Sequence, residues 1–175
     1  MSTGQFLRPY YVMLNRPYPD SRHLRVHRHT IPPAIPLSGL AARHLPPPRF
    51  DGVEQTTQDL QRFVRTLRRD IIRYHNRLGI TADLRRSARL NQRARGAQSG
   101  RAIVDVGIAD IEAKQITLTW ADDRSGRIIV DEDGKILKFV VFGSGGRDWD
   151  RSNDLLGGSD RVEDIVASLD EFTKT

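Results

Sequence analysis

Three histidines near the start of the chain are the first side chains whose type and spacing could do chemistry. His27 and His29 lie two residues apart, so a strand would place both imidazoles on one face as two nitrogen ligands for a metal ion. With only His23 and Asp20 nearby, no strong further ligand completes the set. Because structural metal sites need about four ligands, we interpret these histidines as polar positions of a hairpin and expect no metal site.

Acidic side chains form a second cluster, at Asp122, Asp123 and residues 131–133. Paired carboxylates can serve as general acid and base, but they need a shielded site that tunes their pKa values. Here they alternate with Lys and Arg and fall where turns are expected, and Asp is favoured in turns by local hydrogen bonding. We therefore interpret them as solvated turn residues and not as catalytic groups.

The remaining candidates for chemistry are weaker. Gly143-Ser144-Gly145-Gly146 follows an expected strand, as phosphate-binding loops do, but it lacks the lysine and the spacing of a P-loop. We expect it to end the sheet as a linker. The chain has no cysteine, which excludes thiol nucleophiles, thiolate metal sites, disulfides and a ubiquitin-type thioester enzyme. We expect a protein that is not an enzyme and that uses no cofactor.

Arginine is the largest feature of one charge. Residues 1–101 carry 19 basic and 6 acidic side chains, whereas residues 102–175 carry 9 and 16. Basic helices can face solvent, an acidic protein surface or a phosphate backbone, and no aromatic side chains interleave here for base stacking. Direct DNA binding is therefore the least favoured of the three. The candidate interaction surface consists of Arg62, Arg65, Arg69, Arg85, Arg86, Arg89 and Arg93.

The elements that position these arginines begin with a hairpin. Two short β-prone runs at residues 10–14 and 24–28 predict antiparallel strands, and the Pro-rich residues 30–37 predict an extended segment before a short helix. A long helix follows, with Gly79 as its left-handed stop, and a second basic helix is expected from Thr81. The apolar face of the long helix is predicted to be Leu60, Phe63, Val64, Leu67, Ile71, Tyr74 and Leu78.

The acidic half has the period of strands. Alternation predicts strands at residues 103–108, 116–120, 128–130 and 136–142, with Asp133-Gly134 as the centre of a two-residue hairpin turn. A final helix is expected over residues 160–172, where Asp160 and Glu163 form a capping box. The fold class is therefore α+β, with a four-stranded antiparallel meander flanked by helices.

One string of residues is similar to a known family. Residues 24–37, Leu-Arg-Val-His-Arg-His-Thr-Ile-Pro-Pro-Ala-Ile-Pro-Leu, resemble the corresponding segment of the CENP-O family of inner-kinetochore proteins. The resemblance continues through the long helix to its Tyr-x-x-Arg ending at Tyr74 and Arg77. Residues 10–78 carry the specific match, and the second half fits by its order of elements.

Members of that family have a coiled coil followed by two RWD domains, a fold related to ubiquitin-conjugating enzymes but without catalysis, and in this sequence we expect the RWD part without the coiled coil. Residues 9–78 would then be a partial first RWD-like unit and residues 81–175 a second RWD-like domain, so that the chain looks like a fragment or a short member. The resemblance further implies a structural subunit in the nucleus, at the centromere and kinetochore, with a role in chromosome segregation.

The partners implied by the resemblance are a CENP-P-like protein, as a heterodimer through RWD domains, and subunits of the CENP-Q and CENP-U types. No membrane partner is expected. The alternative is a basic nucleic-acid-binding module that uses the arginine-rich helices. The salt dependence of binding distinguishes the two hypotheses, because phosphate binding weakens steeply with ionic strength and apolar pairing does not.

Overall fold

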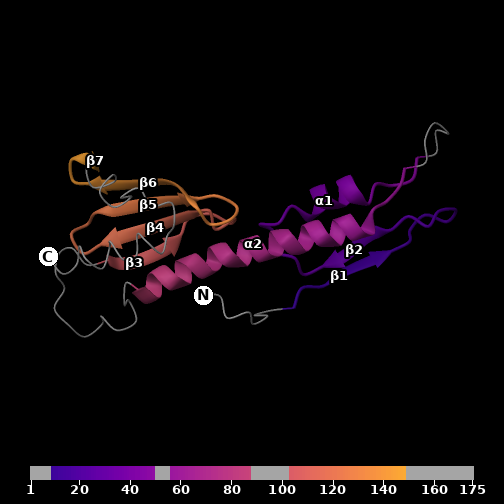
Figure 1. Ribbon diagram of the computed structural model, residues 1–175, viewed down its shortest axis with the longest axis horizontal. Coiled ribbons are helices and arrows are strands. Elements are labelled where there is room, and N and C mark those ends of the chain that lie inside the picture. The colour runs from indigo at the N-terminus through magenta and orange to yellow at the C-terminus, as the bar shows by residue number, and fades with distance from the viewer. Residues whose placement is uncertain (1–8, 50–55, 88–102, 149–175) are drawn as a thin grey trace. The chain divides into compact units, whose positions relative to one another are not determined.

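The computed structural model describes residues 9–49, 56–87 and 103–148. The chain divides into two compact units, residues 1–72 and residues 73–175, and the division falls inside the long helix. Each unit is described by itself (Figure 1). The elements in chain order are β1 Val12–Asn15, β2 Arg25–His29, α1 Leu37–His44, α2 Leu60–Ser87, β3 Ile103–Ile108, β4 Gln115–Trp120, β5 Ser125–Val130, β6 Ile136–Gly143 and β7 Gly146–Asp148.

The first unit begins with the predicted hairpin. Strands β1 and β2 pair antiparallel, with Met13 opposite Arg28, and they form a two-stranded sheet. The alternation of a strand leaves Tyr11 and Met13 exposed, while Val12 is partly covered. The hairpin prediction is confirmed.

The Pro-rich segment turns before α1 instead of running extended. The backbone N–H of Ile35 donates to the carbonyl of Pro32 at 3.0 Å, which closes a turn with Pro33 in its second position. Proline is favoured there because its fixed φ suits the turn. Helix α1 follows at once, with Leu37 and Leu40 buried.

Helix α2 is one continuous element, so the predicted stop at Gly79 is wrong. A glycine ends a helix when its backbone turns left-handed, but here the helix continues through Gly79 to Ser87. The residues beyond it explain the continuation, because Leu84 belongs to the core of the second unit and Ile80 packs against that core. The tertiary contact outweighs the weak helix propensity of one glycine.

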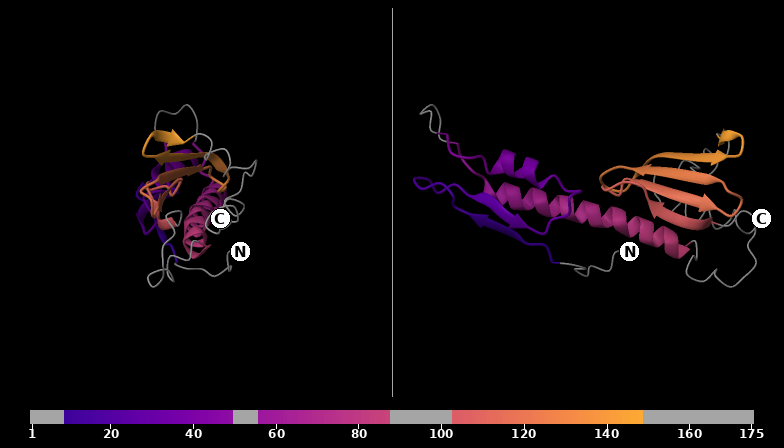
Figure 2. Two further views of the ribbon diagram at one scale, coloured as in Figure 1. Left: turned by 90° about the vertical axis from the view of Figure 1, so that its left-hand side faces the viewer. Right: turned by 180° about the vertical axis from the view of Figure 1, so that it is seen from behind.

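The buried side of α2 in the first unit is narrower than the sequence pattern predicts. Phe63 and Leu67 are buried, whereas Leu60 and Val64 of the same predicted face are exposed. Helix α1 lies beside this half of α2 (Figures 1 and 2). The other buried apolar residues of the unit are Ile31, Ile35, Leu37, Leu40 and Leu45.

The second unit contains an antiparallel meander with five strands in the order β3-β4-β5-β6-β7, and not the predicted four. The fifth strand is short and pairs with β6, with Gly143 opposite Gly146. The Gly-rich stretch predicted as a linker is the turn between these strands, and Gly146 has the positive φ, +104°, that such a turn favours in glycine.

The turn between β5 and β6 also differs in detail from the prediction. Asp131 and Lys135 remain hydrogen-bonded across it, so that the loop holds three residues, Glu132, Asp133 and Gly134, instead of two. Gly134 has a φ of +88°, as three-residue hairpin loops with a glycine bulge require.

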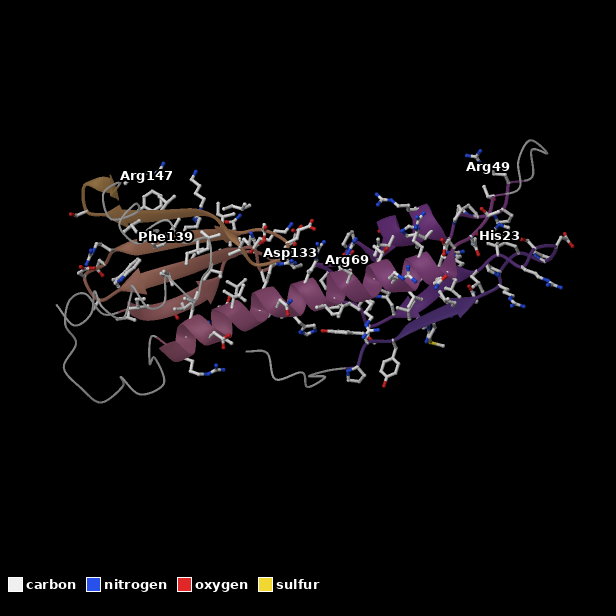
Figure 3. All side chains as sticks on the ribbon, in the orientation of Figure 1. His23, Arg49, Arg69, Asp133, Phe139 and Arg147 are labelled. Carbon is white, nitrogen blue, oxygen red and sulfur yellow. The ribbon has the colours of Figure 1, made fainter. Side chains whose placement is uncertain are left out.

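One face of the sheet forms the core of this unit. The end of α2 covers it through Leu84, with Ile80 beside it, which confirms a helix against the sheet. The predicted final helix, residues 160–172, lies outside the described residues. The sheet residues of the core are Ile103, Val106, Ile116, Leu118, Trp120, Ile128, Val130, Ile136, Phe139 and Val141, of which Figure 3 labels Phe139.

Candidate interaction surface

The first three arginines of the candidate surface lie on α2 within the first unit. Arg62, Arg65 and Arg69 are exposed, and at offsets of three and four residues they share one side of the helix. Figure 3 labels Arg69, whose Nε lies 3.5 Å from Asp70. Within the part of the chain that the structure describes, the guanidinium groups of Arg62 and Arg65 form no ion pair, so they are available to an anionic partner.

The later arginines of the candidate surface have different surroundings. Arg85 donates from Nε to the carbonyl of Val106 at 2.6 Å. Arg86 pairs with Asp83 one turn earlier, at 2.7 Å. Both side chains therefore make contacts within the second unit itself. Arg89 and Arg93 lie outside the described residues.

Two further arginines of α2, Arg73 and Arg77, are absent from the predicted surface and hydrogen-bond to turns of the sheet in the described part of the second unit. Arg73 donates from Nε and Nη2 to the two carboxylate oxygens of Asp133, at 2.8 and 3.3 Å, and from Nη1 to Glu132 at 2.8 Å. Asp133 stands at the turn between β5 and β6 beside α2 (Figure 3). The forked guanidinium suits this bidentate pairing, which a lysine would not reproduce.

Arg77 is the buried member of this pair of arginines. Its Nε donates to the carbonyl of Glu112 at 2.9 Å, and its Nη1 donates to the carbonyl of Glu132 at 3.0 Å. It therefore joins the turn before β4 to the turn before β6 and ties both to α2. Arg77 is the arginine of the Tyr-x-x-Arg motif noted in the sequence. It is only 6% exposed, so its role here is to stabilise the fold.

The two units differ sharply in charge. Residues 9–49 and 56–72 hold ten arginines and three aspartates, whereas residues 73–87 and 103–148 hold ten basic and ten acidic side chains. The positive potential therefore belongs to the first unit, and it is this unit that would attract an acidic partner.

The histidines serve the hairpin. Thr56 offers a carbonyl 2.7 Å from Nε2 of His23, so Nε2 carries the proton, and Nδ1 then accepts from the hydroxyl of Ser21. His27 and His29 are exposed on β2. Among residues 9–49, 56–87 and 103–148, no group of three or more His, Asp or Glu side chains could hold a metal ion.

The acidic cluster works inside turns. The side chain of Arg124 donates to Asp122 from Nε at 2.6 Å and holds the pKa of that carboxyl below its ordinary value. Partial burial opposes the charged form of Asp131, but hydrogen bonds from the backbone N–H groups of Lys135 and Asp133, both 2.9 Å long, outweigh it and lower its pKa. Both groups stay ionised and hold turns, as the sequence indicated.

Gln58 is a residue that the sequence pattern did not single out. Its side chain links the loop before α2 to the hairpin and to the carbonyl of Pro46. No periodicity marks such a residue, because its partners are backbone groups far away in the sequence.

No helix of the described ranges has the length and apolarity to cross a membrane.

Comparison with known proteins identifies the family. The model of the family described as the Cenp-O kinetochore centromere component matches residues 1–169. A search of the curated proteins finds no match. The family is a structural component of the kinetochore, so membership implies a location at the centromere and kinetochore among other kinetochore subunits. Because the match spans nearly all of the 175 residues, the chain belongs to the CENP-O family of kinetochore centromere components.

Proposed function

We propose that this chain is a noncatalytic structural subunit of the inner kinetochore that pairs with a CENP-P-like protein. The observation that carries the proposal is the family match over residues 1–169. The pair then supports centromere and kinetochore assembly, and with it chromosome segregation, together with subunits of the CENP-Q and CENP-U types. This places the chain in the nucleus.

The pairing elements in this proposal are RWD-like domains. Residues 9–78 form a partial first RWD-like unit, and residues 81–175 form a second one. The hairpin followed by a helix in the first unit supports the former, and the antiparallel meander in the second supports the latter. In this proposal each unit contributes its surface and its strand edges to binding a partner. Neither unit needs a catalytic residue for that role.

The hairpin gives a physical reason for a partner. Strands β1 and β2 are hydrogen-bonded only to each other in the sheet of the described first unit, and two-stranded sheets are marginal in water. Tyr11 and Met13 are 62% and 57% exposed on it. A partner that covers them removes apolar surface from water and occupies an open edge.

The arginines are the proposed contact for acidic subunits. Arg62, Arg65 and Arg69 support this part, because they share a side of α2 and extend from a strongly basic unit. Arg85, Arg86, Arg89 and Arg93 complete the proposed surface. Contacts of this kind set the rate and specificity of association more than its affinity.

Coexpression with a CENP-P-like protein tests the pairing. We expect a one-to-one complex by size-exclusion chromatography with light scattering, at about 0.15 M and about 0.5 M salt alike, because apolar contacts are not screened. Met13→Asp should weaken the complex. Ile111→Asp, at a 63% exposed residue between β3 and β4 of the second unit, is the comparison variant and should weaken it less than Met13→Asp does. Separate monomers from the unaltered chain, or binding to duplex DNA that salt abolishes, would contradict the proposal.

A further inference from the structure

One ridge of α2 combines apolar exposure with a border of positive charge. Leu60, Val64 and Ile72 are 40%, 53% and 49% exposed. They occupy positions i, i+4 and i+12, with exposed Arg68 between them, so they follow one i+4 row of the helix surface over about 18 Å. All of them belong to the first unit.

The neighbouring rows give this ridge two different borders. On one side lie Phe63 and Leu67, which are buried. On the other side the next row carries Arg65 and Arg69, both exposed. Apart from Arg68, the ridge is therefore an apolar surface that adjoins the buried core residues on one side and a row of arginines on the other.

We propose that this ridge, Leu60-Val64-Arg68-Ile72, is a docking site for an acidic amphipathic helix of another protein. A ridge of i+4 spacing fits the groove between the corresponding rows of a second helix, which is the commonest way in which helices pack. The apolar stripe of that helix would cover Val64 and Ile72. Carboxylates along one edge of its stripe would meet Arg65 and Arg69.

The charge of the unit selects this occupant over others. Ten arginines against three aspartates in residues 9–49 and 56–72 make a second copy of the same face repulsive. The ridge presents three aliphatic side chains and one arginine, Arg68, so it offers a nucleic acid no aromatic ring for stacking, and most of its surface cannot pair with phosphates. Arginines on a single border also favour one orientation of the bound helix, because its acidic edge must lie on that side.

The inference rests on the proposed function, since it names the surface through which the scaffold receives a further subunit. The probes are designed helical peptides of about 18 residues, long enough to span the ridge. One carries a leucine stripe with glutamates along its edges, a second has lysines in place of the glutamates, and a third has serines in place of the leucines. Binding of each peptide to the full chain is measured by fluorescence anisotropy.

We expect the glutamate peptide to bind, and the lysine and serine peptides to bind at least tenfold more weakly. Val64→Asp with Ile72→Asp should weaken the glutamate peptide about tenfold or more. Arg65→Glu with Arg69→Glu should reverse the preference in favour of the lysine peptide, a gain that a merely unfolded variant cannot show. Leu137→Asp, at a 67% exposed residue of the second unit, is the matched control and should change nothing.

Several results would overturn the proposal. One is equal binding of the glutamate and lysine peptides, or no binding of either. Another is binding that the substitutions at Val64 and Ile72 leave intact. Binding of phosphatidylserine vesicles that depends on Val64 would identify a membrane as the occupant instead. The complex with a CENP-P-like protein is measured separately, so that loss of pairing alone refutes the proposed function, and loss of peptide binding alone refutes this one.

Discussion

The side-chain amide of Gln58 pairs with both backbone groups of Leu24. Its Oε1 accepts from the N–H of Leu24 at 2.7 Å, and its Nε2 donates to the carbonyl of Leu24 at 2.9 Å. The amide thus satisfies the backbone N–H and C=O of Leu24, as the backbone of a neighbouring strand would. Because Nε2 also donates to the carbonyl of Pro46 at 2.8 Å, one side chain holds together three segments of the first unit.

Replacing this amide should loosen the first unit. Gln58→Ala leaves partly buried backbone groups of Leu24 without partners, and we expect the free energy of unfolding to fall by about 1–3 kcal/mol. Urea denaturation followed by circular dichroism measures it. Gln61→Ala, at an exposed position of α2, is the control and should change stability by less than about 0.5 kcal/mol. Equal effects of the two would show that the Gln58 contacts contribute nothing.

Alternation and turn residues predicted strands at the places of β1 to β6, because a half-buried strand leaves its period in the sequence, but they missed β7. The pattern failed at Gly79, where the fate of a glycine depended on the later packing of Leu84. It also failed to distinguish Phe63, which is buried, from Val64, which is exposed. A helical period marks an apolar arc, but it does not show how wide the covering layer is.

The polar contacts were beyond sequence analysis for a related reason. Arg73 and Arg77 lie among other arginines of one helix, and nothing local distinguishes the two that meet turns about 55–60 residues further on. Arg62 and Arg65 were correctly expected at the surface. Arg62 and Arg73 are eleven residues apart and share a side of α2, so the difference arises from which turns of the helix belong to the unit that contains the sheet.

Arg77 should be the most sensitive charged residue of the second unit. Arg77→Met keeps most of the side-chain volume but leaves the carbonyls of Glu112 and Glu132 without this donor, so we expect a loss of about 2–4 kcal/mol. Hydrogen exchange should also rise in residues 109–114 and 131–135. Arg86→Met, which removes only an exposed pair with Asp83, should cost less than about 1 kcal/mol. Unchanged exchange at both turns would contradict the role of Arg77.

The two depressed carboxyl pKa values predict a loss of stability in acid. Asp122 and Asp131 have lower pKa values in the folded chain than their ordinary value, so ionisation stabilises the fold. This contribution is complete above about pH 4, the range of an unfolded aspartate, and disappears as the pH falls through the lower folded values. Urea titrations between about pH 6 and pH 2 should show the fall.

A variant isolates the share of Asp131 in this acid response. Asp131→Asn cannot ionise, so it should be less stable than the parent chain at neutral pH and approach it in acid. Asp123→Asn, at an exposed aspartate of the turn before β5, is the control and should follow the parent curve. A constant difference between Asp131→Asn and the parent across the whole pH range would show that charge is not what holds this turn.

Two glycines of the second unit should respond in opposite directions to the same added methyl group. A Cβ at Gly126 would lie 2.7 Å from Cη2 of Trp120 and 3.2 Å from Cε2 of Phe139, and both rings are fixed in the core. We expect Gly126→Ala to destabilise by about 1–3 kcal/mol and to shift the tryptophan emission as the indole is displaced.

A Cβ at Gly79 would meet nothing within 4 Å. Because alanine favours a helix interior over glycine, Gly79→Ala should stabilise by about 0.5–1 kcal/mol. If Gly79→Ala destabilises instead, the helix does not run unbroken through that residue and the stop expected from the sequence is real.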